Sequence, residues 1–207
     1  DLSALRASAE VALLDAALCG VTTLIDHHES PSCIEGSLDV IMAAAKSVGI
    51  RVVPSYGAPD RHTHADACRG IAECERVLRA GIPAMVGLHA GFTVGDETLA
   101  CASDLARRHG AWTHLHLAED PCDAASFDRL VRAGLLGPKS LLAHGVHLSA
   151  AERAHLAEAG AWIAVNPRSN LQNAVGYAPV LAMGRQVALG TDGMDGDVLA
   201  ELRVAHL

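Results

Sequence analysis

The stretch THLHLAED, residues 113–120, combines the pattern of a buried strand with a cluster of ionisable side chains. Its first half alternates histidine with leucine, which is typical of a β-strand that presents different residue types on its two faces. His114 and His116 therefore share one face, and Glu119 follows where the strand ends. Two imidazoles and a carboxylate in this arrangement indicate either a solvated sheet edge or a chemical site.

Comparable stretches recur along the whole chain and alternate with helical patterns. We predict strands within residues 21–28, 50–57, 84–92, 111–119, 140–146, 161–167 and 185–192. We predict helices at 3–19, 36–48, 64–79, 96–108, 123–133 and 149–158, and a last helix that begins near 196. Strands that alternate with helices at a spacing of roughly 25 residues predict parallel βα units.

Both a doubly wound open sheet and a (β/α)8 barrel fit this alternation, and the strand ends distinguish them. Polar side chains stand at the carboxyl ends of nearly all the predicted strands: His27, His28, Tyr56, His89, His116, Glu119, His144, Asn166 and Asp192. In a barrel these ends converge on one mouth, where barrel enzymes place their chemistry. An open sheet of the nucleotide-binding kind would carry a glycine-rich phosphate loop, and the sequence contains none. We therefore predict an α/β fold, a TIM-type barrel with one strand missing.

Composition restricts the partners that the protein can have. Half of the 207 residues are hydrophobic, but no apolar run is long enough to cross a bilayer, so we expect a soluble protein without a membrane partner. A net charge of −8 argues against nucleic acid. Most of the six cysteines fall in helical patterns, where we expect small buried thiols, and the absence of a CxxC pair favours the cytoplasm. The sequence leaves open whether the protein forms a homo-oligomer.

The motif H-x-x-E, formed by His116 and Glu119, has two interpretations. A neutral imidazole at a strand end is a good zinc ligand, and a neighbouring carboxyl group can carry protons from an activated water. Alternatively, His114 and His116 are hydrogen-bonded histidines of the core. His144, at the end of the apolar strand in LLAHGVHL, has the same two interpretations.

Two further motifs follow later strands. In ALGTDGM, residues 188–194, Gly190 and Gly193 would let the backbone turn tightly where Asp192 faces the mouth. The alternative is that Asp192 caps the next helix. The segment NPRSN, residues 166–170, is rich in turn-forming residues and could be only a turn.

The order of these motifs, H-x-x-E, strand-end histidine, N-P-x-S-N and G-T-D-G, resembles the amidohydrolase superfamily. More narrowly, it is similar to the branch of deaminases and chlorohydrolases that includes guanine, cytosine and S-adenosylhomocysteine deaminases. The segments 20–39 and 166–180 bring it nearest to the SsnA-type aminohydrolases. The resemblance implies a metal-dependent hydrolase of carbon–nitrogen bonds other than peptide bonds. Such an enzyme would deaminate an amidine-type carbon of a nitrogen heterocycle, a small-molecule substrate.

The resemblance also implies roles for individual residues. His116 and Asp192 match metal ligands, and Glu119, His144 and Asp192 match catalytic groups that handle the water and its proton. The metal would be a divalent ion, zinc before iron or manganese, although imidazole and carboxylate ligands suit all three. His89 matches a histidine that contacts substrate, whereas His114 has no counterpart and is expected to support its neighbours.

The remaining strand-end residues are candidates for substrate binding. His27, His28 and Asn166 end their strands at the same mouth, and we expect them to contact the substrate. For the two adjacent histidines a hydrogen bond to the following turn is an equal alternative, and the sequence does not say which of them faces inward.

The chain departs from the family pattern in one respect. The family's first strand carries H-x-H, which supplies two metal ligands, and nothing here corresponds to it. The H-x-H formed by His62 and His64 falls in the loop after a later strand, and we expect it to be solvated. We therefore expect residues 1–207 to form a single incomplete barrel domain with strands 2–8, without strand 1 and the flanking β-sandwich.

Three alternatives for function stay open, and this departure motivates the first two. The chain could be a non-catalytic barrel, or a metal-deficient fragment of an enzyme. A member of the same superfamily could also cleave an amide or a carbon–halogen bond, because pocket residues outside the motifs choose the bond.

Overall fold

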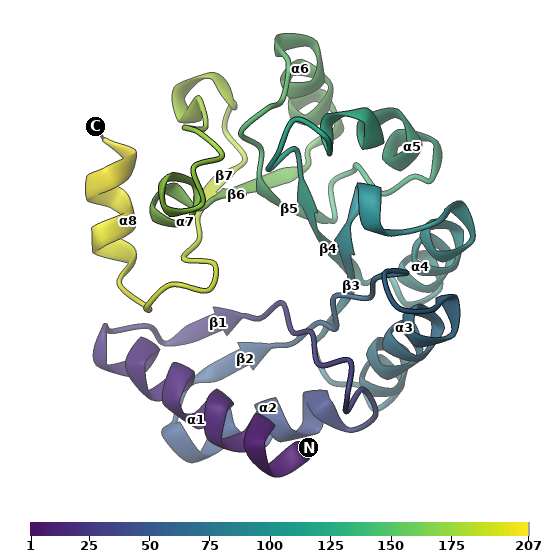
Figure 1. Cartoon of the computed structure of the whole chain (residues 1–207), viewed down its shortest axis with the longest axis vertical. Helices are drawn as coiled ribbons and strands as arrows, with labels where there is room; N and C mark the ends of the chain where they lie inside the picture. The colour runs from purple at the N-terminus through teal and green to yellow at the C-terminus, as the bar shows by residue number, and fades with distance from the viewer. Residues whose placement is uncertain (207) are drawn as a thin grey trace.

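The computed structural model describes residues 1–206, in which parallel strands alternate with helices (Figure 1). The strands are β1 (Thr23–Ile25), β2 (Arg51–Val53), β3 (Met85–Ala90), β4 (Trp112–Leu117), β5 (Ser140–His144), β6 (Trp162–Val165) and β7 (Val187–Leu189). The helices are α1 (Leu2–Leu18), α2 (Ser37–Val48), α3 (His64–Arg79), α4 (Asp96–His109), α5 (Phe127–Arg132), α6 (Ala150–Ala159), α7 (Pro167–Gln172) and α8 (Val198–Ala205). Short 3₁₀ turns occupy Gly91–Thr93, Ala124–Ser126 and Val180–Ala182. All of the predicted strands are therefore present, each shorter than its predicted range.

The strands pair in chain order and every pairing is parallel. β1 pairs with β2, and β3 to β7 form a second sheet in the order of the sequence. Beyond β2 the backbone continues the ladder, because the His89 amide donates to the Ala58 carbonyl at 3.1 Å. The strands curve around a common centre and the helices lie outside them (Figure 1). The predicted parallel α/β fold is confirmed, and within residues 1–206 no pairing joins β1 to β7.

The alternation along β4 separates the core from the interior of the curved sheet. Leu115 and Leu117 are almost completely buried and belong to the main apolar cluster, together with Leu99 and Leu105 of α4. Because side chains alternate across a strand, His114 and His116 point to the opposite face, away from the helices. The apolar layer between strands and helices therefore fixes the direction of the histidines.

Local signals account for most helix ends. Helix α6 begins with a capping box, in which Ser149 and Glu152 each accept the other's backbone N–H, and ends at the left-handed Gly160. NPRSN is not only a turn, because Pro167 is the first residue of α7. A helix of six residues is too short to show a period, and proline is favoured at this first position. No helix within residues 1–206 has both the length and the apolar character to span a membrane.

The cysteine prediction is only partly correct. All six thiols are free, and Cys74 is buried as expected. Cys19, Cys68, Cys101 and Cys122 are instead exposed. A helical pattern does not by itself say which face of the helix a residue such as Cys68 or Cys101 occupies, and Cys122 lies outside the helices.

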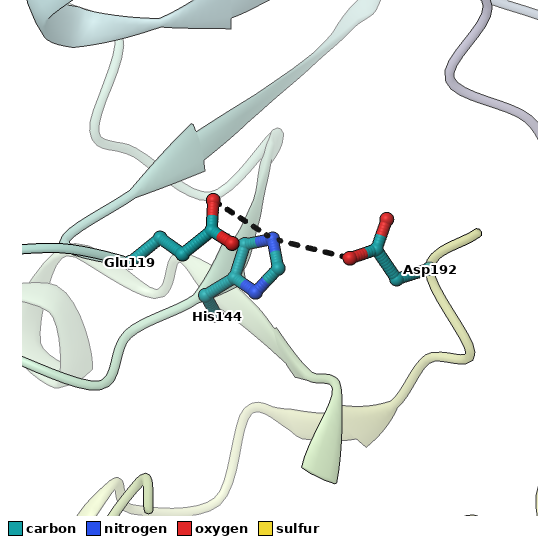
Figure 2. Close-up of side chains that lie close together, drawn as sticks. All are labelled: Glu119, His144 and Asp192. Atoms are coloured by element: carbon teal, nitrogen blue, oxygen red, sulfur yellow. Dashed lines mark ion pairs between the residues drawn. The ribbon is translucent and has the colours of Figure 1, made fainter. Parts of the chain in front are cut away.

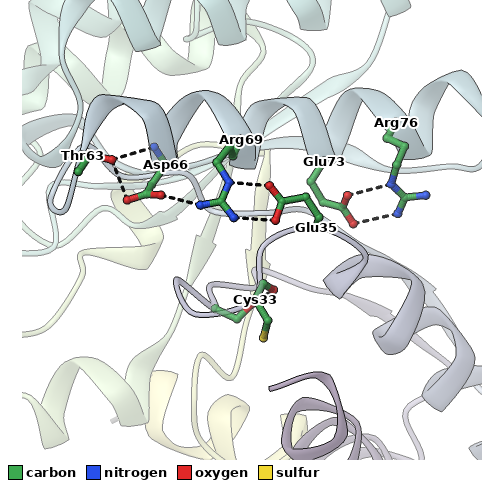
Figure 3. Close-up of polar contacts among 8 residues, drawn as sticks. Cys33, Glu35, Thr63, Asp66, Arg69, Glu73 and Arg76 are labelled. Carbon is green, nitrogen blue, oxygen red and sulfur yellow. Dashed lines mark hydrogen bonds and ion pairs between the residues drawn. The ribbon is translucent and has the colours of Figure 1, made fainter.

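A ladder of ion pairs attaches α3 to the segment that precedes α2 (Figure 3). Arg69 donates to both oxygens of Glu35, at 2.5 and 2.7 Å. Two turns later Arg76 donates to both oxygens of Glu73, whose side chain is only 2% exposed. Glu73 also accepts the backbone N–H of Leu38 at 3.3 Å, in the first turn of α2. Glu73 therefore joins two helices through a buried carboxylate.

We expect E73Q to lower the free energy of unfolding by about 1–3 kcal/mol, because the variant weakens a buried charged acceptor that two donors share. The matched control is E10Q, which removes the exposed Arg6–Glu10 pair of α1 and should change stability by less than about 0.5 kcal/mol. Urea unfolding followed by circular dichroism measures both variants. Equal losses in the two variants would show that the ladder is not a structural link.

Candidate active site

Five histidines from four strands meet inside the curved sheet. The ring of His27 lies 4.6 Å, centre to centre, from the rings of both His114 and His116. The ring of His116 in turn lies 5.0 Å from that of His89 and 5.3 Å from that of His144. The carboxyl ends of β1, β3, β4 and β5 thus build one continuous imidazole cluster, as expected for strand ends that share a mouth.

The structure shows which of the two adjacent histidines faces this cluster. His27 packs edge-on against His114 and His116, and both of its ring nitrogens are shielded from solvent without a hydrogen-bond partner among the described residues. His28 turns away, with its ring 5.8 Å from that of Tyr56 and its Nε2 2.7 Å from the hydroxyl oxygen of Ser30. The hydrogen bond to the following turn therefore belongs to His28.

Burial keeps His27, His114 and His116 neutral. Removal from water, reinforced by the neighbouring His116, lowers the pKa of His114 to about 3. Burial and then His144 lower the pKa of His116, and burial lowers the pKa of His27 well below its ordinary value. A neutral imidazole has a free nitrogen lone pair, which is the form that binds metals and accepts protons.

Glu119, His144 and Asp192 converge at the edge of the cluster (Figure 2). The His144 Nε2 lies 3.7 Å from a Glu119 oxygen and 3.9 Å from an Asp192 oxygen. One ligand atom from each residue lies within 4.8 Å of the other two. Residues from the ends of β4, β5 and β7 therefore form a small set of nitrogen and oxygen donors.

The backbone at these three strand ends has an uncommon conformation. Among residues 1–206, the non-glycine residues with positive φ are Ala118, His144, Ala174 and Asp192, at 50°, 78°, 56° and 54°. Three of these four therefore lie at this site or next to it. A left-handed non-glycine residue costs of order 1–3 kcal/mol, and such strain is concentrated at functional sites. The chain leaves β4, β5 and β7 through sharp turns that direct side chains toward each other.

The glycines beside Asp192 act differently from the prediction. Asp192 itself takes the left-handed conformation, and a side chain at Gly193 would meet nothing within 4 Å. Gly190 is required for another reason, because a Cβ there would lie 2.3 Å from the amide oxygen of Asn166. The two glycines therefore do not make the turn, and Gly190 makes room for a buried amide.

Helix α7 supplies the partners that orient two of the converging side chains. The amide oxygen of Asn170 can only accept, so Nδ1 of His144 donates to it, at 2.8 Å, and Nε2 is left free. The hydroxyl of Ser169 donates to Asp192. Burial alone would raise the pKa of Asp192, but the bond from Ser169 and the nearby His144 outweigh it and lower that pKa. Asp192 is thus held as a carboxylate.

These donors fit a divalent metal. Nδ1 of His116 donates to the His89 carbonyl, which leaves its Nε2 free in the same way as that of His144. Imidazole nitrogens and carboxylate oxygens are ligands that zinc, iron and manganese accept, and hydrogen bonds from the second ring nitrogen are their usual support. Glu119, His144 and Asp192 have ligand atoms close enough together to hold such an ion, and the ring of His116 lies 5.3 Å from that of His144 beside them.

The other predicted site residues take several positions. His89 is half-buried at the end of β3, with its Nδ1 3.0 Å from the Thr93 hydroxyl. Asn166 is only 4% exposed, and its amide nitrogen lies 3.4 Å from the His144 Nδ1. His62 is exposed, as predicted, and His64 begins α3 with its side chain half-exposed. Substrate contacts by His89, His27, His28 and Asn166 stay predictions.

Sequence reasoning missed two residues of the site. Ser169 and Asn170 lie within NPRSN, a motif that indicates a turn and carries the family resemblance but predicts no role for these two side chains. The signal that could have found them is their spacing. Residues three and four positions after Asn166 lie on one face of a helix, so a helix starting at Pro167 places both beside the strand ends.

Comparison with known proteins places the chain in a family. The sequence model described as "Amidohydrolase family" matches residues 3–207. The 8-oxoguanine deaminase of Pseudomonas aeruginosa is 31% identical over 220 residues, which cover 91% of this chain and 49% of that protein. The chain spans about half the length of the curated relatives that it matches.

Solved structures agree with the fold. An adenosine deaminase of Xanthomonas campestris with bound zinc superimposes with a TM-score of 0.87 at 25% identity, covering 99% of this chain and 50% of that one. A mutant atrazine chlorohydrolase of Arthrobacter aurescens, complexed with zinc and atraton, superimposes with a TM-score of 0.87 at 21% identity. The match covers 100% of this chain and 53% of that one.

The buried neutral histidines predict loss of stability in acid. His114 has a pKa of about 3 in the folded chain and about 6.5 when unfolded, so the unfolded chain binds more protons between these values. Stability is therefore complete above pH ~6.5 and falls below it, by about 1.4 kcal/mol per pH unit for His114 alone. Urea unfolding of the metal-free chain at several pH values measures this slope.

H114Q should reduce by about one the number of protons taken up on unfolding, and should therefore flatten the slope of stability against pH. H62Q, in an exposed loop, should leave the slope unchanged. Identical slopes in the wild type and H114Q would contradict the assignment of a neutral buried imidazole.

Proposed function

The chain belongs to the amidohydrolase family, and we propose that it forms the larger part of the catalytic barrel of a metal-dependent hydrolase. Its reaction is the hydrolysis of a carbon–nitrogen bond outside peptides, with release of ammonia. The observation that carries this proposal is the convergence of Glu119, His144 and Asp192 from three strand ends within 4.8 Å. The non-catalytic alternative gives no reason for three ionisable groups at strained strand exits.

The fold we propose is a (β/α)8 barrel in which these strands are the second to the eighth. Within residues 1–206, β1 pairs only with β2 and β7 only with β6, so each has one edge that accepts a further parallel strand. Ile25, two residues before His27 and on the same face, is 46% exposed, as expected for an apolar side chain whose neighbour is absent. A first strand between these edges would close the ring and bring further imidazoles beside His27.

The metal that we propose is zinc, held by His116 and Asp192, with His144 beside them. When bound, a divalent metal lowers the pKa of a coordinated water toward ~7. Asp192, ionised and fixed by Ser169, would accept one proton from the attacking water and pass it to the leaving amine. Glu119 would carry the other proton from the water to the ring nitrogen of the substrate, and His144 would orient the oxygen that attacks.

The substrate class that we propose is an aminated nitrogen heterocycle, with purines first. The curated relatives support this choice, because they include an 8-oxoguanine deaminase and 5'-deoxyadenosine deaminases. His89 and His27 stand at the same mouth and would contact the heterocycle. A heterocycle offers a ring nitrogen beside the aminated carbon, which is the atom that a nearby carboxyl group such as Glu119 can protonate.

We expect the full-length protein that contains this chain to bind one zinc ion and to release ammonia from at least one purine, pyrimidine or triazine. E119Q should keep the zinc and lower the rate by about 10²–10⁴-fold, because it removes only the proton carrier. D192N should lose both zinc and activity. Elemental analysis and an enzyme-coupled ammonia assay measure these outcomes.

H62Q is the matched control, because this histidine is exposed and is neither a proposed ligand nor a proposed catalytic group, and it should keep both zinc and activity. A well-folded full-length protein without metal would contradict the proposal, as would full activity in E119Q.

A further inference from the structure

A buried carboxylate outside the site contacts the turn that carries Glu119. Asp123, in the loop after β4, is only 1% exposed. Its Oδ2 accepts the backbone N–H of Ala118 at 2.6 Å. Neither the metal donors nor the proton-carrying groups include this residue, although it lies only a few positions after Glu119.

Ala118 needs such support because its backbone is left-handed, with φ of 50°. Alanine resists this conformation, since its Cβ crowds the following carbonyl. Both backbone polar groups of Ala118 are hydrogen-bonded. Asp123 accepts its N–H, and the His147 amide donates to its carbonyl at 2.9 Å. Without the carboxylate, the buried N–H loses its partner and the turn can relax to negative φ.

The loops after β3 and β4 pack closely around Asp123. The loop after β3 packs on this carboxylate, because a Cβ at Gly91 would lie 2.4 Å from the Cβ of Ser126 and 3.4 Å from Oδ1 of Asp123. Arg129 fixes that loop by donating to the Gly91 carbonyl at 3.0 Å. The loops after β3 and β4 therefore close around the side chain that holds the turn.

We propose that Asp123 is a positioning residue, whose carboxylate holds Ala118 left-handed and thereby aims Glu119 at His144. The catalytic consequence rests on the proposed function of Glu119, whereas the structural consequence does not. The direction of the Glu119 side chain follows from the Ala118 turn, and the 3.7 Å contact with the His144 Nε2 depends on it. A shift of about 1 Å at such a group can lower a rate by about 10²-fold.

Hydrogen exchange at the Ala118 amide tests the structural part without any activity. D123A should accelerate this exchange at least about tenfold, because the amide loses its acceptor. D123N keeps a weaker acceptor and should accelerate it about twofold to fivefold. D128A is the matched control, since Asp128 is an exposed aspartate of α5, the helix that follows this loop, and it should leave the amide unchanged. Unchanged exchange in both Asp123 variants would overturn the proposal.

Kinetics of the full-length protein test the catalytic part. D123A should lower kcat by about 10–100-fold while KM and zinc content stay within about threefold, because only the aim of Glu119 changes. Adding A118G to D123A should recover at least about threefold in kcat, since glycine adopts the left-handed turn without strain.

Equal losses of kcat, zinc and folded protein in D123A and D123N, without recovery by A118G, would show a merely structural residue and overturn the proposal. If the full-length protein released ammonia from no substrate, the proposed function would fail, but the exchange at Ala118 would still decide whether Asp123 holds the turn.

Discussion

The left-handed backbone at the exits of β4, β5 and β7 is the constraint on which the site depends. Ala118, His144 and Asp192 leave their strands with positive φ, a conformation that each residue adopts only because its surroundings impose it. A hydrogen bond to Asp123 holds the backbone of the Ala118 exit, and hydrogen bonds with Asn170 and Ser169 hold the side chains of His144 and Asp192. The convergence of the donors is thus a product of strained turns and the buried groups that hold them.

The site depends in turn on helices far along the chain. Helix α7 supplies Ser169 and Asn170, and a buried ion pair joins it to α8, where Glu201 accepts from the Arg168 side chain at 2.7 Å and from its backbone N–H at 3.0 Å. The imidazole cluster depends on the apolar layer, because burial of Leu115 and Leu117 directs the histidines of β4 inward. Fold and site therefore share the same buried contacts.

The sequence predicts those parts of the site that periodicity and strand ends determine. His116, Glu119 and Asp192 follow from alternation and from their places after apolar runs, and the parallel fold follows from repeated βα units. Periodicity could not predict α7, which is too short, or the left-handed exits, which tertiary packing imposes. The inward direction of His27 and the bond from Asp123 to Ala118 depend on packing between segments that no local pattern records.

Anomalous X-ray diffraction at the zinc edge, from crystals of the full-length protein grown with zinc, tests whether His116 and Asp192 hold the metal. We expect one strong peak, about 2.0–2.2 Å from both Nε2 of His116 and a carboxylate oxygen of Asp192, between the ends of β4 and β7. A well-ordered mouth without a peak would contradict this metal site, as would zinc bound only at an exposed thiol such as Cys68.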